Sequence, residues 1–151
     1  MPWGKKFEDG TVMDQAFFCE GVAATNKLEF LKWAREVKHC EWNEWTINQA
    51  AGKGHTDILK YFVEERKISE EAKESCVATT ATYGKIDCLN YLVEEAKVPL
   101  DLWVHVAYAR YKEHHDCVNY LREKGSHEPT DEQYAIFVED QQRDSEEENS
   151  D

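Results

Sequence analysis

Four segments of this chain repeat one short pattern at a nearly constant spacing. Each carries an acidic residue in the same place, and these acids (Glu29, Asp57, Asp87 and Asp116) are 28, 30 and 29 residues apart. A period of this size is typical of proteins built from stacked repeats, in which each unit packs on its neighbours. The repeated segments are 26–33, 54–61, 84–91 and 113–120.

Each repeated segment predicts the start of an amphipathic helix. In the second unit Ile58, Leu59 and Phe62 recur at helical spacing, and the other units repeat this spacing. A second candidate helix, rich in small residues, precedes each segment, and small side chains allow two helices to approach closely. The sequence therefore predicts an all-α fold of about four helical hairpins, with first helices over 14–24, 44–51, 70–82 and 102–111.

The junction between the two helices of each unit also repeats. Gly54 and Gly84 occupy it in two units and Asn26 in the first, and both residue types tolerate the left-handed backbone that ends a helix. The fourth unit has Glu113 at this position. We therefore expect the fourth turn to be built differently.

Polar residues mark where several helices begin. Thr130 and Gln133 have the spacing of a capping box, which predicts a last helix opening at Thr130. The acidic run after this helix predicts a solvated, disordered tail. We expect an N-terminal extension over 1–10, repeats over 11–125, a C-terminal capping helix over 126–140 and a disordered acidic tail over 141–151. Good N-cap residues also precede three of the first helices, at Asn43, Ser69 and Asp101.

A helix, a tight glycine turn, a second helix and a short link resemble an ankyrin repeat. The best match is 43–55, which ends in Ala50-Ala51-Gly52-Lys53-Gly54-His55. The resemblance implies a right-handed solenoid with a concave face, a protein-binding role and no catalytic residues. This chain departs from the family's period of about 33 residues and lacks its Thr-Pro-Leu-His tetrapeptide. Another solenoid of helical hairpins is the alternative, and tetratricopeptide repeats, of about 34 residues, fit less well.

The charge of the chain disfavours two classes of partner, nucleic acids and anionic membranes. Its 18 basic and 31 acidic residues give a net charge of -13, which disfavours nucleic acid and anionic membranes and favours a basic protein partner. No apolar run approaches the roughly 20 residues of a membrane span, so direct membrane insertion is not expected. Five cysteines without a CxxC motif fit a reducing compartment, and we expect the cytoplasm or nucleus, with an organelle interior left open.

One cluster of residues raises the question of metal or catalytic chemistry. His114, His115 and Cys117 lie close in sequence, and Cys88 holds the register of Cys117 one unit earlier. A zinc site is one interpretation. The other is that both cysteines are small apolar residues of the buried face, because Ile58 occupies the same register. No phosphate-binding loop or nucleophile motif is present, so we expect neither an enzyme nor a cofactor.

Aromatic residues at links and first turns are the best lead to function. Exposed tryptophan and tyrosine are favoured anchors of protein interfaces, and the alternative is that they close the apolar seam between units. The sequence predicts a protein-binding scaffold or adaptor. Its rivals are a structural accessory subunit of a larger complex and a metal-binding domain using His114, His115 and Cys117. The candidate partner-binding residues are Trp42, Trp45 and Trp103, together with four first-helix positions whose register predicts exposure, Asn48, Thr79, His105 and Tyr108.

Overall fold

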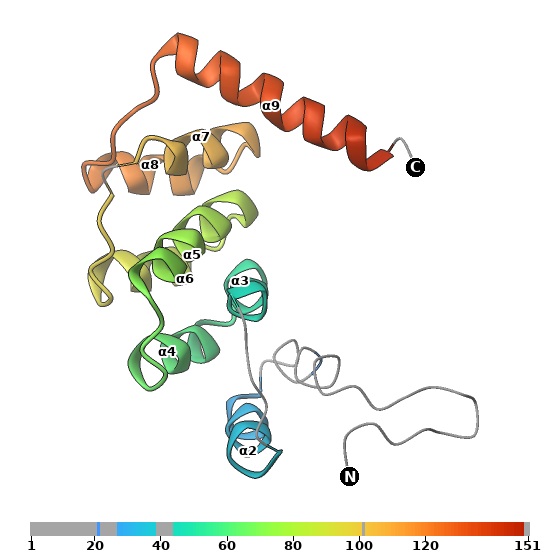
Figure 1. The fold of residues 1–151 in the computed structure, drawn as a ribbon. Helices are drawn as coiled ribbons and strands as arrows, with labels where there is room; N and C mark the ends of the chain where they lie inside the picture. The colour runs from blue at the N-terminus through green and yellow to red at the C-terminus, as the bar shows by residue number, and fades with distance from the viewer. Residues whose placement is uncertain (1–20, 22–26, 39–43, 101, 150–151) are drawn as a thin grey trace. The chain divides into compact units, whose positions relative to one another are not determined.

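The computed structural model describes residues 21, 27–38, 44–100 and 102–149, and all regular structure in these ranges is helical. The all-α prediction is therefore confirmed for this part of the chain (Figure 1). The predicted helix over 14–24, apart from Gly21, lies outside these ranges, as do Asn26, Trp42, Asn43 and Asp101. The helices are α2 (Leu28–Lys38), α3 (Glu44–Gly52), α4 (Thr56–Glu64), α5 (Glu70–Tyr83), α6 (Ile86–Glu94), α7 (Val104–Tyr111), α8 (His115–Glu123) and α9 (Asp131–Asn149).

The turns inside three hairpins share one geometry. The backbone is left-handed at Gly54, Gly84 and Glu113, with φ of 76°, 69° and 61°. The prediction for the two glycines is confirmed, whereas the expectation of a different turn at Glu113 is wrong. The same bond closes each turn, as in a Schellman motif. It runs from His55 N–H to the Ala50 carbonyl (3.0 Å), from Lys85 to Thr80 (2.9 Å) and from His114 to Ala109 (2.9 Å).

The links that leave the second helices repeat as well. Lys67 and Lys97, 30 residues apart, both have a positive φ, of 49° and 57°. The residue after each lysine donates its N–H back to the preceding helix, from Ile68 to Phe62 at 3.4 Å and from Val98 to Leu92 at 3.0 Å. The period read from the sequence therefore also governs the irregular backbone between helices.

The chain divides into two compact units, Met1–Cys76 and Val77–Asp151, with the division inside α5. In the first unit α4 contacts both α3 and α2. Leu31, Ile58 and Leu59 are fully buried there, and Phe62 is 1% exposed. Burial of such side chains contributes about 1.5–3 kcal/mol each, so this apolar seam contributes strongly to the stability of the unit.

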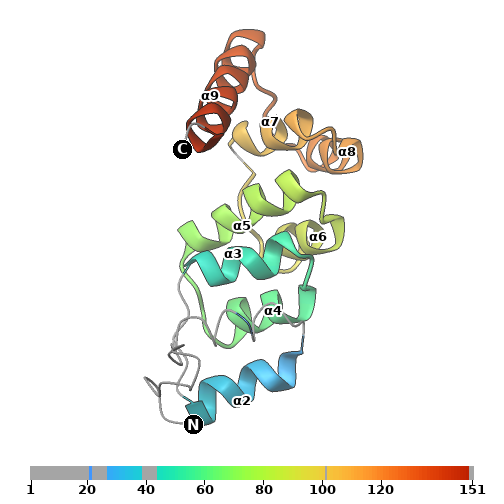
Figure 2. The same ribbon diagram turned by 90° about the vertical axis from the view of Figure 1, so that its right-hand side faces the viewer.

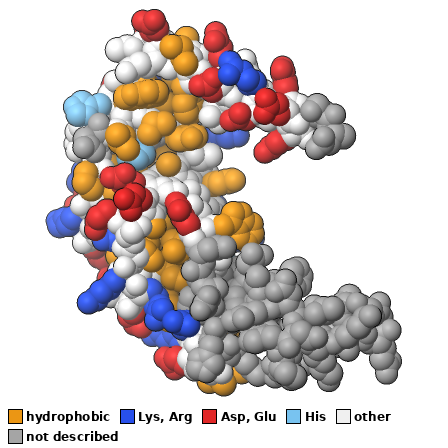
Figure 3. Space-filling view, viewed as in Figure 1, with side chains coloured by type: hydrophobic (Ala, Val, Ile, Leu, Met, Phe, Trp, Pro, Cys, Tyr) orange, Lys and Arg blue, Asp and Glu red, His pale blue; other side chains and the backbone are white. Residues whose placement is uncertain are grey.

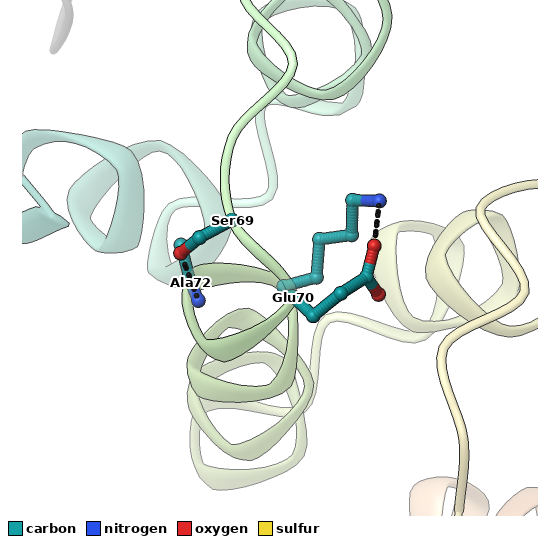
Figure 4. Close-up of polar contacts among 4 residues, drawn as sticks. Ser69, Glu70 and Ala72 are labelled. Atoms are coloured by element: carbon teal, nitrogen blue, oxygen red, sulfur yellow. Dashed lines mark hydrogen bonds and ion pairs between the residues drawn. The ribbon is translucent and has the colours of Figure 1, made fainter.

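Ser69 caps the helix at the end of the first unit, as the sequence predicts. Its Oγ accepts a hydrogen bond from the backbone N–H of Ala72 at 3.1 Å, which satisfies one of the free donors of the first turn of α5 (Figure 4). In the same turn Lys73 Nζ lies 2.8 Å from Glu70 Oε1. These contacts are local, so they can be predicted from neighbours in the sequence.

In the second unit α8 packs against α7 and α6, and α9 contacts α7. Figures 1 and 2 both show α7 and α8 side by side. Cys88 and Cys117 are fully buried in this unit, together with Leu89, Leu92 and Leu121. The interpretation of the two cysteines as small apolar residues of the buried face is therefore confirmed.

The last helix is longer than the sequence predicts. Its capping box forms as expected, since Thr130 N–H donates to Gln133 Oε1 (2.9 Å) and Gln133 N–H donates to Thr130 Oγ1 (3.2 Å). However, α9 continues to Asn149 where we expect a disordered tail after residue 140. Contacts one turn apart support the extension, with Ser145 Oγ donating to the Gln141 carbonyl at 3.0 Å and Arg143 3.5 Å from Asp140. None of the helices in the described ranges is long and apolar enough to cross a membrane.

Candidate functional site

Trp45 is the most exposed of those candidate partner-binding residues that the structure describes. It lies in the first turn of α3, and 52% of its surface is exposed. The same helix buries Thr46, Ile47, Ala50 and Ala51 on its other side. Because the buried face fixes the orientation of α3, Trp45 is held on the outside of the first unit.

Asn48, one turn further along α3, has a structural role. Its Nδ2 donates to Ser75 Oγ at 2.9 Å, and its Oδ1 accepts from Cys76 Sγ at 3.6 Å. These bonds tie α3 to the first half of α5 across 27 and 28 residues of sequence. Asn48 and Thr79 are both half-buried, so neither is the freely exposed side chain that the register predicts.

The three candidates around α7 have different environments. His105 is only 1% exposed, so the expectation that it lies on the surface is wrong. Trp103 and Tyr108 are half-buried, and both contact Phe137 of α9. Their aromatic rings therefore close an intramolecular seam, which is the second of the two roles that the sequence leaves open.

Several aromatic rings pack around Phe137, and the sequence did not predict these contacts. Its ring centroid lies 6.5 Å from that of Trp103, 4.9 Å from Tyr108 and 6.1 Å from Tyr111, with all three rings nearly perpendicular to it. Edge-to-face geometry of this kind is the favoured arrangement of aromatic pairs. A signal was present in the sequence, because Tyr108 and Tyr111, like Tyr134 and Phe137, are spaced i, i+3 on one helix face.

A polar cluster joins α6 to α8 in the second unit. Tyr120 Oη lies 3.4 Å from both Asn90 Oδ1 and Glu94 Oε1, and Lys124 pairs with Glu94. Burial, followed by the charge of Glu94, raises the pKa of Tyr120 to about 12. The hydrogen bond from Lys124 lowers the pKa of Glu94 below its ordinary value. The cluster therefore holds two second helices together with Tyr120 neutral and Glu94 ionised.

The residues of the suggested metal site are not arranged around a common centre. Cys117 is fully buried, and desolvation, with a smaller effect of Asp116, raises the pKa of its thiol to about 11. A thiol with so high a pKa is a poor source of the thiolate that a nucleophilic mechanism needs. His115 is exposed, whereas the His114 ring lies against Gly84. Within the described ranges, no three His, Cys, Asp or Glu side chains are placed to hold a metal ion.

Comparison of the chain with protein-family models, with curated proteins and with solved structures finds no match. The similarity to ankyrin repeats therefore stays an expectation from the sequence. What the structure adds is the recurrence of one turn geometry in three hairpins, at Gly54, Gly84 and Glu113.

Proposed function

We propose that this protein is a non-enzymatic scaffold or adaptor that binds another protein through its first helices and the loops between units. The observation that carries this proposal is the exposure of Trp45, at 52%, on a helix whose other side is buried. Tryptophan is strongly enriched among the residues that dominate interface energies. The ankyrin resemblance implies that first helices line a concave binding face, and Trp45 would lie on that face.

The charge of the chain favours a basic partner surface. The net charge is -13, and α9 presents exposed acidic side chains along its length, seen as red groups at the upper right of Figure 3. Complementary charge mainly raises the rate of association, and this effect weakens as salt screens it. Among the described residues, Cys76, Cys88 and Cys117 do not pair with one another as disulfides, which fits a partner in a reducing compartment such as the cytoplasm or nucleus.

A capture experiment tests the proposal. Tagged full-length protein retains a specific partner from its native source at low salt, and retains less of it at high salt. Trp45→Ala removes the anchor and abolishes retention while the helical circular dichroism is unchanged. Trp33→Ala is the matched control, because Trp33 is also an exposed tryptophan, at 41%, but lies on the second helix α2, outside the proposed binding surface, so its loss leaves retention intact. Equal retention by both variants would rule out the Trp45 surface.

The same material separates an adaptor from a fixed subunit of a larger complex. An adaptor is recovered mainly as the free chain in native mass measurements. Recovery only as a stable assembly of constant stoichiometry would favour the accessory-subunit hypothesis instead.

A further inference from the structure

Helix α9 is attached to the second unit through one buried side chain. Between 131 and 148, Phe137 is the only buried residue, at 7% exposure, whereas its neighbour Ile136 is 54% exposed. Of the other 17 side chains of this stretch, 13 are exposed, and eight of those are acidic. A helix held by a single anchor has little buried surface to lose when it detaches, so it belongs to the least stable part of the fold.

The surface beneath α9 has the form of a receptor for an aromatic side chain. Three residues, Trp103, Tyr108 and Tyr111, present their rings to Phe137 at 4.9–6.5 Å between centroids, with interplanar angles of 81–88°. We call these three residues the aromatic face of α7. A single ring enclosed edge-on by three others is the arrangement expected of an interface anchor seated in its pocket.

A second contact defines what else the surface recognises. Tyr134 stacks on Phe137 with an interplanar angle of 16°, and the Arg110 guanidinium lies 4.0 Å from the centroid of the Tyr134 ring. Tyr134 and Phe137 are three residues apart, so they lie on the same side of one helix. The surface thus accepts two aromatic residues at i and i+3, one in the aromatic face of α7 and one beneath a cationic side chain.

Charge distinguishes the outer end of α9 from its attached end. The first turn carries Asp131 and Glu132, whose negative charges stabilise the positive end of the helix dipole. The last turn carries no basic residue that would stabilise the negative end. Glu146, Glu147 and Glu148 lie at the negative end of the helix dipole, where anionic side chains are unfavourable. The helix dipole therefore favours the attached end of α9 over its outer end.

We infer that α9 is an intramolecular substitute for a ligand. The aromatic face of α7 binds an amphipathic helix of a partner protein that carries two aromatic residues spaced i, i+3. α9 occupies this surface until the partner displaces it, in the helix-in-groove mode of peptide recognition. This surface uses residues other than Trp45, so its test can fail while the proposed binding through Trp45 stands.

The test uses the full-length chain and a labelled peptide with the sequence of 129–149. The Phe137→Ala chain, whose own α9 has lost its anchor, binds this peptide at least about tenfold more tightly than the wild-type chain, because a tethered α9 competes at a high effective concentration. Ile136→Ala in the chain is the matched control and behaves as wild type, since Ile136 is exposed. The same peptide with Phe137→Ala does not bind.

Three results would overturn the inference. The first is equal peptide affinity of the Phe137→Ala and wild-type chains when both have native circular dichroism. The second is equal binding of the anchored and anchorless peptides. The third is a wild-type dimer in light scattering that Phe137→Ala dissociates, because the surface would then be filled by α9 of a second copy.

Discussion

Glu113 holds a backbone conformation that glycine adopts in the equivalent turns. Its φ is 61°, against 76° at Gly54 and 69° at Gly84. A side chain in the left-handed region costs roughly 1–2 kcal/mol, whereas glycine adopts it without a steric penalty. We predict that Glu113→Gly raises the free energy of unfolding by about 0.5–1 kcal/mol, measured by urea denaturation.

A neighbouring residue provides the control for this change. Lys112 has an ordinary φ of -90°, so Lys112→Gly gains no relief from strain and lowers stability through the added freedom of the unfolded chain. If Glu113→Gly lowers stability as Lys112→Gly does, the left-handed turn at Glu113 is incorrect.

Gly84 is required for a second reason, because the His114 ring lies directly above it. An added Cβ would lie 2.6 Å from His114 Nδ1, and φ at Gly84 is already positive. We predict that Gly84→Ala lowers the free energy of unfolding by about 2–4 kcal/mol, from backbone strain together with steric overlap. Thermal and urea denaturation measure this loss.

Gly125 distinguishes the cost of backbone strain from the cost of steric overlap. Its φ is +86°, but a Cβ there would meet nothing within 4 Å, so Gly125→Ala carries the backbone cost alone, about 1 kcal/mol. In the Gly84→Ala background, His114→Ala recovers part of the loss by removing the overlap. An equal cost at Gly84 and Gly125 would show that His114 does not pack on Gly84.

Between helices, the contact of Tyr120 with Glu94 makes stability depend on alkaline pH. The pKa of Tyr120 is about 12 in the folded chain, above its ordinary value of 10.0. The unfolded chain therefore releases this proton first, so the contribution is complete below pH 10 and is lost as the pH rises toward 12. We predict that Tyr120→Phe makes the fall of unfolding free energy between these pH values shallower.

Tyr83→Phe is the comparison for this pH experiment, because it removes a hydroxyl from a ring that is 60% exposed. Its pH profile should follow that of the wild-type chain. If the profiles of Tyr120→Phe and wild type coincide, Tyr120 does not form the contact between α6 and α8.

At the scale of helices, the sequence predicts those features that depend on near neighbours. Ser69 caps α5, Thr130 and Gln133 form their capping box, and Gly54 forms its left-handed turn, because each involves residues a few positions apart. The geometry at Glu113 was missed because non-glycine residues rarely adopt positive φ. Repetition of the unit, rather than residue type, determines that turn.

Features that depend on tertiary packing were predicted less well. The sequence left open whether Trp45 is exposed or closes the seam between units, and the structure exposes it, whereas His105, whose register predicted exposure, is buried. The register of a helix does not determine which neighbouring helix covers a given side of it. The packing of Phe137 against Trp103 was not predicted, because the two residues are 34 positions apart and this contact does not recur with the repeat.

At the scale of the whole molecule, the proposed function depends on the helical hairpins and on the exposed Trp45. We propose that the helical hairpins provide rigid positions for side chains and that Trp45, exposed on one of them, is the anchor for a protein partner. In this proposal the net charge of -13 would orient a basic partner toward the chain, and Trp45 would supply the contact that retains it.

Calorimetric titration of the captured partner tests this claim most directly. We predict that Trp45→Ala raises the Kd at least about tenfold, a loss of about 1.4 kcal/mol or more, while Trp33→Ala, on the second helix α2, leaves the Kd within about twofold of wild type. An unchanged Kd for Trp45→Ala, in a chain with native helical circular dichroism, would contradict it.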